Sequence, residues 1–367
     1  MAQSSPKIAA GFFLEDFRVG AVMEHPGSRT LTEGDAAVYL ALTGDRHPVH
    51  CNGPFARSLG FEGQRMHDLL VFHIVFGLTV GEVSYNSVAN LGYADLRFLA
   101  PVFPGDTLSA SSEVVGLKEN SDRITGIVYV CTQGRNQHGT SVIEYCRWVM
   151  VRKRNASASI PDPIVPNLVP DVVPDRMGAT IQKTLSGLGT KATGSDAALE
   201  DYERGEWIVH PCGLTLEDAD HMSATRLYHN TARVHLDARV AGQMPYKKRL
   251  VYGGHIISLA YSLSYNGLQN GLGMLAWNKG SHVNPCFAGD TIYAMTRVLD
   301  SARLPGRDDL GALRLRLIGV KNREPDPVLL ESSKSSKNRQ RAHSDIVLDL
   351  DYWLLMPTAA ALERRQT

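Results

Sequence analysis

The chain has 367 residues, 43% of them hydrophobic, and its 38 basic side chains balance 38 acidic ones at a pI near 7.2. That length accommodates two domains with their own cores, because a domain is typically about 100–200 residues long. Since the charge is balanced, we expect neither nucleic acid nor a membrane surface as a partner.

A helix is predicted to begin near Thr32, which together with Asp35 fits an N-cap followed by an acidic first turn. A loop from Asp45 to His50 follows, and then a helix from Asp68. The apolar run 69–76 inside that helix is far shorter than the ~20 residues of a membrane helix, so we interpret it as core. Alternating and β-branched segments then predict strands over 91–98, 107–117, 125–132 and 142–151.

Residues 155–200 are rich in proline, alanine, serine and glycine, which predicts an extended linker. Strands are predicted again over 291–299, 313–320 and 346–356. The polar run 332–341 between two of them is interpreted as a solvated hairpin loop, with contact to a phosphate as the second interpretation. The turns at Gly105-Asp106 and Gly289-Asp290 are interpreted as entries into strands.

The five cysteines form no C-x-x-C pair, so we interpret all of them as reduced thiols. The first eleven residues lack the charged and apolar regions of a secretory signal. Together these features predict a cytoplasmic protein.

The chain repeats itself. His50 recurs as His235 (235 − 50 = 185), and the segment beginning at Pro101 recurs from Pro285 (285 − 101 = 184). The repeat predicts an α+β fold in which a long helix is wrapped by an antiparallel sheet, twice over. We place the first copy at 12–154, the linker at 155–200, the second copy at 201–357 and a polar tail at 358–367.

One loop carries the chemistry in each copy. In the first, Asp45 and His50 lie five residues apart across a proline, so a carboxylate and an imidazole could hold one water molecule between them. That arrangement suits the addition of water to a carbon–carbon double bond. In the second copy the aligned residues are Asn230 and His235. Asn52 and Asp237, just after the two histidines, are interpreted as structural.

The loop Thr43-Gly44-Asp45-Arg46-His47-Pro48-Val49-His50-Cys51-Asn52 resembles the hydratase motif of the MaoC-like, R-specific enoyl-CoA hydratases, with His47 where asparagine is usual. Longer strings, among them 68–77, 145–154, 224–235 and 349–353, resemble the mesaconyl-CoA hydratase family. The resemblance implies a tandem double hot-dog fold. It also implies the reversible dehydration of (2R,3S)-β-methylmalyl-CoA to mesaconyl-C1-CoA, without a cofactor.

Either copy could hold the site. The first has the better pair, because a carboxylate can activate water whereas an amide can only orient it. The second has the better oxyanion position: Gly253 and Gly254 would let backbone N–H groups approach a thioester oxygen at a helix start. Asp68 stands there in the first copy, and we expect it to cap its helix. The resemblance favours His235 and Asn230, with His50 and Asp45 as the alternative and a composite site left open.

Several further expectations follow. Cations near the second motif are candidates to bind CoA phosphates or a substrate carboxylate: Arg226, Arg233, Lys247, Lys248 and Arg249. Four other histidines are interpreted as core or turn residues, and no metal site is expected: His47, His67, His73 and His255. The two copies would form the hot-dog pair within one chain, and further homo-oligomerisation stays open. The alternative functions are a generic R-specific 2-enoyl-CoA hydratase, a thioesterase, and a catalytically silent acyl-CoA-binding protein.

Overall fold

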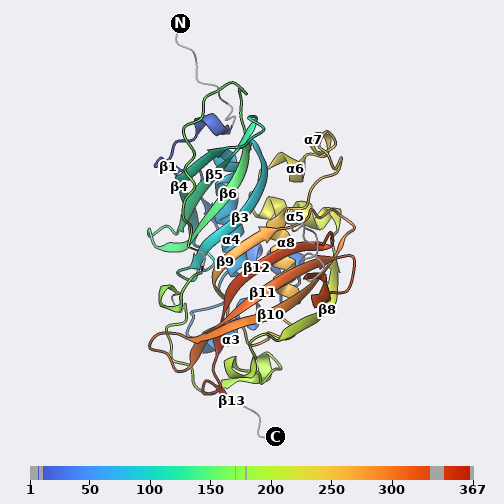
Figure 1. The fold of residues 1–367 in the computed structure, drawn as a ribbon. Helices are drawn as coiled ribbons and strands as arrows, with labels where there is room; N and C mark the ends of the chain where they lie inside the picture. The colour runs from blue at the N-terminus through green and yellow to red at the C-terminus, as the bar shows by residue number, and fades with distance from the viewer. Residues whose placement is uncertain (1–6, 8–10, 170, 178–179, 331–342, 364–367) are drawn as a thin grey trace.

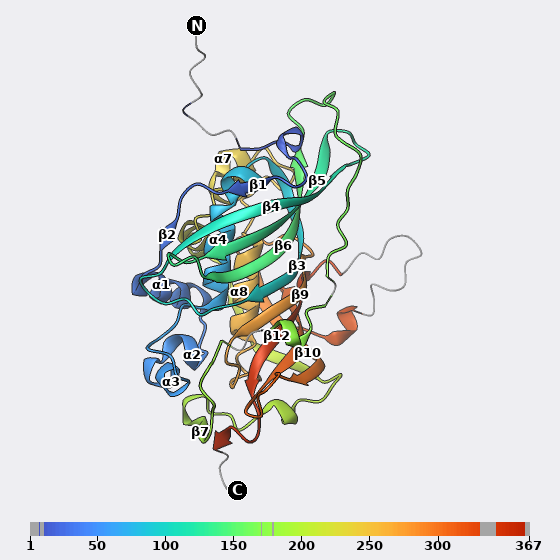
Figure 2. The same ribbon diagram turned by 90° about the vertical axis from the view of Figure 1, so that its left-hand side faces the viewer.

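The computed structural model describes residues 7, 11–169, 171–177, 180–330 and 343–363, so the polar run at 332–341 lies outside the described residues. One antiparallel sheet runs through both halves of the chain in the order β1-β4-β5-β6-β3-β9-β12-β11-β10-β8. Figures 1 and 2 show two long helices, α4 and α8, lying along one side of it. The predicted α+β architecture is confirmed.

The strands of the first half are β1 (Val22–Glu24), β2 (Arg29–Thr30), β3 (Ser87–Phe98), β4 (Thr107–Glu119), β5 (Thr125–Arg135) and β6 (Ser141–Arg152). Those of the second half are β7 (Leu188–Gly189), β8 (Trp207–Thr215), β9 (Met274–His282), β10 (Thr291–Arg303), β11 (Leu310–Lys321), β12 (Ile346–Pro357) and β13 (Leu362–Glu363). Every predicted strand falls inside an observed one. Most observed strands are longer than predicted, because hydrogen bonding continues past the residues that alternate between apolar and polar.

The α-helices are α1 (Glu33–Thr43), α2 (Pro48–Cys51), α3 (Gly53–Ser58), α4 (Asp68–Leu78), α5 (Asp218–Leu227), α6 (Arg233–Leu236), α7 (Ala238–Ala241) and α8 (Gly253–Leu263). A π-helix spans Val80–Ser84, and short 3-10 turns span Leu14–Asp16, Pro174–Arg176, Thr190–Ala192, Leu199–Asp201 and Pro327–Leu330. None of the helices in the described part of the chain is long and apolar enough to cross a membrane.

Local signals in the sequence place several of these ends correctly. Thr32 caps α1: its hydroxyl accepts from the Asp35 N–H at 3.2 Å, and the Asp35 carboxylate accepts from the Thr32 N–H at 2.8 Å. Asn52 and Asp237 cap the short helices α3 and α7, which confirms their structural role. The Asp106 carboxylate accepts from the Phe103 N–H at 2.8 Å and so closes the turn that leads into β4.

α4 is buried around its whole circumference, from Asp68 to Gly77, and α8 is buried from Gly254 to Leu263. A helix that is apolar on every side belongs inside a protein rather than on its surface. The Phe72 ring of α4 lies 4.8 Å from the Trp277 ring of β9. Burying an aromatic side chain of this kind contributes roughly 1.5–3 kcal/mol, so such contacts hold the two halves together.

The seam between the halves is polar as well as apolar. β3 pairs with β9 antiparallel, with Ala94 opposite Lys279. Behind that pairing, His73 Nε2 of α4 lies 2.8 Å from the Ser258 hydroxyl of α8. Tyr39 donates to the same hydroxyl at 2.9 Å. Because these groups are buried, their mutual hydrogen bonds fix the register of one helix against the other.

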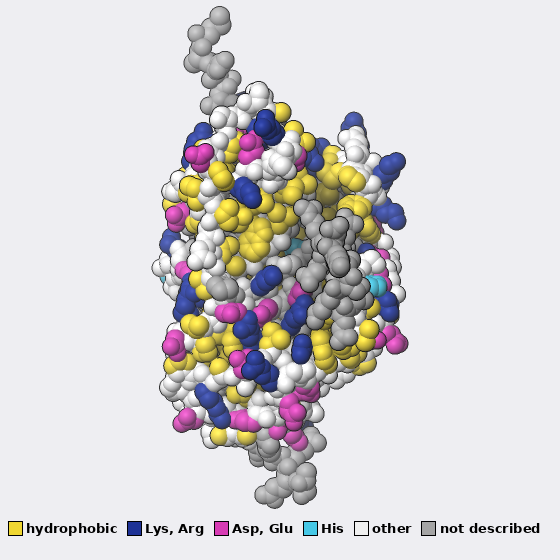
Figure 3. All heavy atoms as spheres, in the orientation of Figure 1, with side chains coloured by type: hydrophobic (Ala, Val, Ile, Leu, Met, Phe, Trp, Pro, Cys, Tyr) yellow, Lys and Arg dark blue, Asp and Glu magenta, His cyan; other side chains and the backbone are white. Residues whose placement is uncertain are grey.

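The outer face of the second half is covered by paired charges. Arg314 and Arg316 of β11 each pair with an aspartate diagonally across on β12, Asp351 and Asp349, at 2.7 Å. Figure 3 shows basic and acidic side chains interspersed over this face. Exposed pairs contribute little stability, typically below about 1 kcal/mol, so this face is solvated while the opposite face of the sheet packs on the helices.

The linker region packs closely against the second half. Val172, Ile181 and Leu188 are buried in a cluster with Leu310 and Leu355. β7 also pairs in parallel with β13. The described residues of the segment form only short 3-10 turns and the two-residue strand β7, and its apolar residues anchor it to the sheet. The domain boundaries proposed from the sequence stay predictions.

Gly77 lies at a close contact between the halves. A Cβ at this position of α4 would meet the Tyr228 carbonyl oxygen at 1.8 Å. The backbone at 228–229 leads directly to Asn230, and His229 has a φ of 52°. The glycine therefore lets the second-copy loop rest on the first-copy helix.

We predict that Gly77→Ala lowers the free energy of unfolding by about 3 kcal/mol, because either the helix or the loop must move to admit the methyl group. Gly81→Ala is the matched control, since no atom lies within 4 Å of a Cβ built there. Urea-induced unfolding of both variants measures the difference. Equal tolerance at the two positions would contradict the close approach.

Candidate active site

His235 lies in α6, and its ring is held by the backbone. Nδ1 lies 2.7 Å from the Leu250 carbonyl oxygen. Because a carbonyl can only accept, Nδ1 carries the proton and Nε2 keeps its lone pair. Burial lowers the pKa of His235 to about 4, against the raising effect of the Leu250 carbonyl. The side chain is therefore a neutral base, and it keeps 9% exposure.

Asn230 follows α5 and is 2% exposed. Its Oδ1 accepts from the Ala232 N–H at 3.0 Å, and its own N–H donates to the Thr225 carbonyl. The side-chain NH2 makes no hydrogen bond to any residue in the described part of the chain. Since Oδ1 is engaged, the amide can act as a donor to a bound oxygen.

The N-terminus of α8 is open. Its N-cap residue, Tyr252, makes no side-chain capping bond. Among the described residues the N–H groups of Gly253 and Gly254 have no partner. A Cβ on Gly254 would meet the Tyr252 ring at 2.4 Å, so the absence of side chains keeps this turn compact. Free N–H groups at a helix start favour a negative charge or an oxyanion.

His282, at the end of β9, was missed by the sequence analysis. A Cβ on Gly253 would meet its ring at 2.6 Å. Its Nε2 lies 3.3 Å from the hydroxyl of Tyr93, which belongs to β3 of the first half. The repeat gives no signal here, because the aligned residue in the first copy is Phe98 (282 − 184 = 98). The second-copy site is thus lined from both halves.

The first-copy pair does not form. The Asp45 carboxylate bonds the His47 ring at 2.6 Å, and its other oxygen lies 3.5 Å from His67 Nε2. Both ring nitrogens of His50 are buried without a hydrogen-bond partner among the described residues. Burial raises the pKa of Asp45, but the His47 ring outweighs it and leaves that pKa below its usual range. His47, interpreted as a core or turn residue, is fully buried, and its bond to Asp45 was not predicted.

The helix start in the first copy is closed. Arg65 donates two hydrogen bonds to the Asp68 carboxylate, of 2.6 and 2.9 Å. Asp68 also accepts from the Met274 N–H at 3.0 Å, and Arg65 donates to the Leu272 carbonyl at 3.1 Å. The prediction that Asp68 caps α4 is wrong: His67 is the N-cap, and its Nδ1 accepts from the Leu69 N–H. The Asp68 carboxylate instead neutralises the buried guanidinium of Arg65.

The predicted cations differ in whether they already pair with a carboxylate. Arg249 pairs with Asp218, and Arg233 lies 3.6 Å from Asp237. Arg226 is exposed and makes only long bonds, of 3.4 Å, to its own helix. Lys247 and Lys248 are exposed on the loop before α8. Their ammonium groups have no partner in the part of the chain that the structure describes, so they are the cations that remain free.

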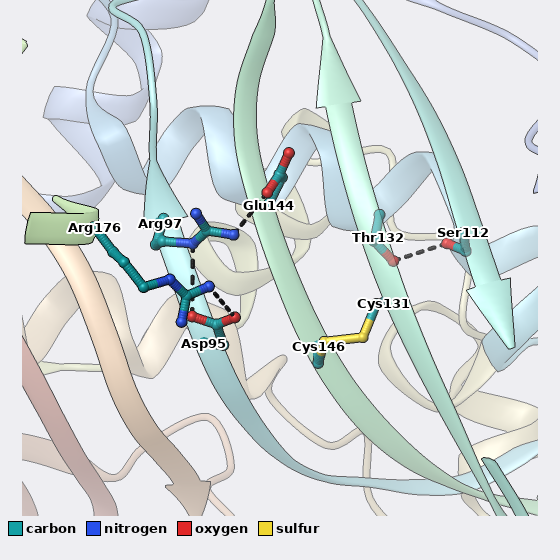
Figure 4. The surroundings of a disulfide bond; sticks show 8 residues. All are labelled: Asp95, Arg97, Ser112, Cys131, Thr132, Glu144, Cys146 and Arg176. Carbon is teal, nitrogen blue, oxygen red and sulfur yellow. Dashed lines mark hydrogen bonds and ion pairs between the residues drawn. A yellow bond between two sulfur atoms is a disulfide. The ribbon is translucent and has the colours of Figure 1, made fainter. Parts of the chain in front are cut away.

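Two cysteines depart from the sequence interpretation. Cys131 and Cys146 form a disulfide between β5 and β6, so the prediction of five reduced thiols is wrong for this pair (Figure 4). The two residues are directly opposite in the strand register, which sequence spacing alone does not reveal. A surface pocket of about 470 Å³ adjoins the disulfide, with Arg97 and Glu144 in its lining. It does not include the predicted site residues.

Tandem central helices wrapped by one sheet, with a histidine loop facing a helix start, define the class of MaoC-like double hot-dog dehydratases. A putative MaoC domain dehydratase structure from Chloroflexus aurantiacus superposes with a TM-score of 0.92 at 48% identity, covering 96% of this chain and 99% of that one. A double hot-dog protein from Mycobacterium tuberculosis gives 0.67 at 24% identity, covering 95% and 98%, which shows the fold alone.

Residues 5–335 match the family model described as mesaconyl-CoA hydratase, and the chain belongs to that family. It is 49% identical to β-methylmalyl-CoA dehydratase of Chloroflexus aurantiacus and 46% identical to mesaconyl-CoA hydratase of Cereibacter sphaeroides. Each match covers 96% of this chain and 99% of the relative. The chain is accordingly a hydro-lyase. No group of residues suited to a metal ion occurs within the described ranges.

The pKa of His235 can be measured directly. We predict that its ring titrates with a midpoint near pH 4 in the folded chain, because burial disfavours the imidazolium. In the urea-unfolded chain the midpoint should return to about 6.5. Since the unfolded chain binds the proton more tightly, this histidine's contribution to stability is complete above about pH 6.5 and is lost as the pH falls toward 4. Nitrogen-15 NMR of the ring measures both midpoints, and equal values would contradict the burial.

Proposed function

We propose that the chain catalyses the reversible dehydration of (2R,3S)-β-methylmalyl-CoA to mesaconyl-C1-CoA in its second-copy site. The names of the two relatives, at 49% and 46% identity over nearly their full length, support the substrate. The observation that carries the choice of site is the open N-terminus of α8 near a histidine with a free Nε2. The corresponding helix start in the first copy is filled by Arg65 and Asp68.

The proposed reaction begins with the thioester oxygen bound by the N–H groups of Gly253 and Gly254. As negative charge develops on that oxygen, these donors stabilise it without having to reorient. His235 Nε2 takes the α-proton, and the C–H electron pair passes into the enolate. The imidazolium then returns the proton to the β-hydroxyl. The C–O bond breaks, the double bond forms and water leaves.

The low pKa of His235 fits the second half of this sequence. An imidazolium with a pKa of about 4 is a strong acid, so it readily gives up its proton to the departing hydroxyl. The amide NH2 of Asn230 would hold that hydroxyl and the water formed from it. One base and one donor on the same face suffice, and no cofactor takes part in the reaction.

Further assignments belong to the same proposal. Lys247 and Lys248, exposed and free of partners among the described residues, would bind phosphates of CoA. The two hot-dog halves pair within one chain, as in the double hot-dog neighbour. We place the protein in the cytoplasm because its substrates are CoA esters. The cysteines no longer indicate that location, since Cys131 and Cys146 are bonded.

The substrate is tested by comparing hydration of mesaconyl-C1-CoA with that of crotonyl-CoA, followed by loss of enoyl absorbance. We expect kcat/KM to be at least tenfold higher for mesaconyl-C1-CoA, a difference of about 1.4 kcal/mol in transition-state binding. A preference for crotonyl-CoA would identify a generic enoyl-CoA hydratase. Tight binding of both esters without turnover would identify an acyl-CoA-binding protein, and release of free thiol a thioesterase.

The choice of copy is tested by two single substitutions. His235→Ala should lower kcat by about 10²–10⁴-fold, because it removes the general base. His50→Ala is the matched control at the aligned position and should change kcat by less than about threefold, since His50 is only 1% exposed. Thermal unfolding of both variants checks that they fold. The opposite pattern would move the site to the first copy.

A further inference from the structure

Arg147 of β6 is a buried cation that forms no ion pair with any described residue. Its side chain is 0% exposed. Nη1 donates to the Ser84 hydroxyl at 2.9 Å and Nη2 to the Thr79 hydroxyl at 2.8 Å. Nε has no partner among the described residues. A guanidinium has five N–H donors, so these two bonds leave donors available.

The charge of Arg147 is compensated only in part. No carboxylate lies within 4.0 Å of it in the part of the chain that the structure describes, whereas the other fully buried arginine, Arg65, is paired with Asp68. The Phe76 ring lies 4.3 Å from the guanidinium carbon, and Thr79 marks the C-terminal end of α4. A ring face and a helix C-terminus both favour a cation, but each does so more weakly than an ion pair does. Burial accordingly lowers the pKa of Arg147.

The position of Arg147 connects it to the second-copy site. It lies directly opposite Tyr93 in the pairing of β6 with β3. The Tyr93 hydroxyl lies 3.3 Å from His282, and the His282 ring lies where a Cβ on Gly253 would point. A second path leads through ring contacts, from Phe76 to Tyr252 at 5.5 Å and from Tyr252 to His235 at 5.7 Å. Both paths place the guanidinium behind the inner wall of that site.

The repeat shows that this cation is specific to one copy. β6 and β12 have the same length, and Trp148 aligns with Trp353 (353 − 148 = 205). In that alignment Arg147 corresponds to Tyr352. The first-copy sheet therefore offers a cation toward the second-copy site, and the second-copy sheet offers a neutral phenol in the equivalent place. This asymmetry matches the asymmetry between the open start of α8 and the closed start of α4.

We propose that Arg147 binds the free carboxylate of the substrate's acyl group and so selects dicarboxylic acyl-CoA esters over monocarboxylic ones. The inference rests on the proposed function for the identity of that ligand. Mesaconyl-CoA carries its free carboxylate at the end of the acyl group away from the thioester. With the thioester oxygen at Gly253, that carboxylate would extend toward the wall behind which Arg147 lies, and the Tyr93 and Tyr252 rings would have to move aside for it to reach the guanidinium. The planar fork of a guanidinium matches a carboxylate through two parallel hydrogen bonds.

Binding of two unreactive analogues tests the proposal in the full-length chain. Succinyl-CoA carries the carboxylate and butyryl-CoA does not, and calorimetry gives the Kd of each. Arg147→Met should weaken succinyl-CoA binding by about 10- to 100-fold, the range expected for a hydrogen bond to a charged group. Butyryl-CoA binding should change by less than about threefold. Tyr352→Phe is the matched control on the other copy and should leave both Kd values unchanged.

The remaining outcomes are also decisive. Equal weakening of both analogues, or of neither, would overturn the proposal and leave Arg147 a structural residue. If Arg147→Met does not fold, Arg147→Lys decides: it keeps the charge but loses the fork, so succinyl-CoA binding alone should weaken by about tenfold. If the wild-type chain discriminates between the analogues through Arg147 but does not hydrate mesaconyl-C1-CoA, the proposed function fails and the carboxylate site stands.

Discussion

The pairing of β3 with β9 is the constraint on which the rest of the structure depends. By joining two sheets edge to edge, it places α4 and α8 together behind one surface, so that each helix start faces residues of the other half. Neither site can then be described from its own copy alone. The second-copy site takes Tyr93 from the first half, and the first-copy helix start is closed by 272–274 from the second.

The same geometry explains how two copies of one motif came to differ. At equivalent positions stand Asp68 and Gly253. A carboxylate at a buried helix start needs a counter-ion, and once Arg65 supplies it the pair fills the space that a substrate oxygen would need. A glycine has no side-chain charge that requires a counter-ion. The N–H groups of Gly253 and Gly254 therefore have no partner among the described residues. His50 and His235 then diverge in consequence: His50 is enclosed without a hydrogen-bond partner among the described residues, and His235 is fixed by Leu250 with Nε2 available.

Much of this was predictable, because it depends on residues close in the sequence or on the repeat. The Thr32–Asp35 cap, the buried helix from Asp68 and the strand positions all follow from local patterns. The features that the sequence did not predict depend on tertiary packing rather than on distance along the chain. The bond between Asp45 and His47, the ion pair that replaces the expected cap, and the disulfide between opposite residues of β5 and β6 are set by how strands and helices meet. The sequence does not predict that Arg147 is buried, because a single arginine in a strand is usually exposed.

The contact at Gly77 has a consequence for how such a protein can change over time. A duplicated domain is normally free to separate again, because each half began as a complete unit. Here the loop that carries Asn230 rests on a helix of the other half, with no room for even one methyl group between them. Each half has become part of the other's scaffold, so a gene split in the region that encodes residues 155–200 would yield two fragments that work only by reassembling.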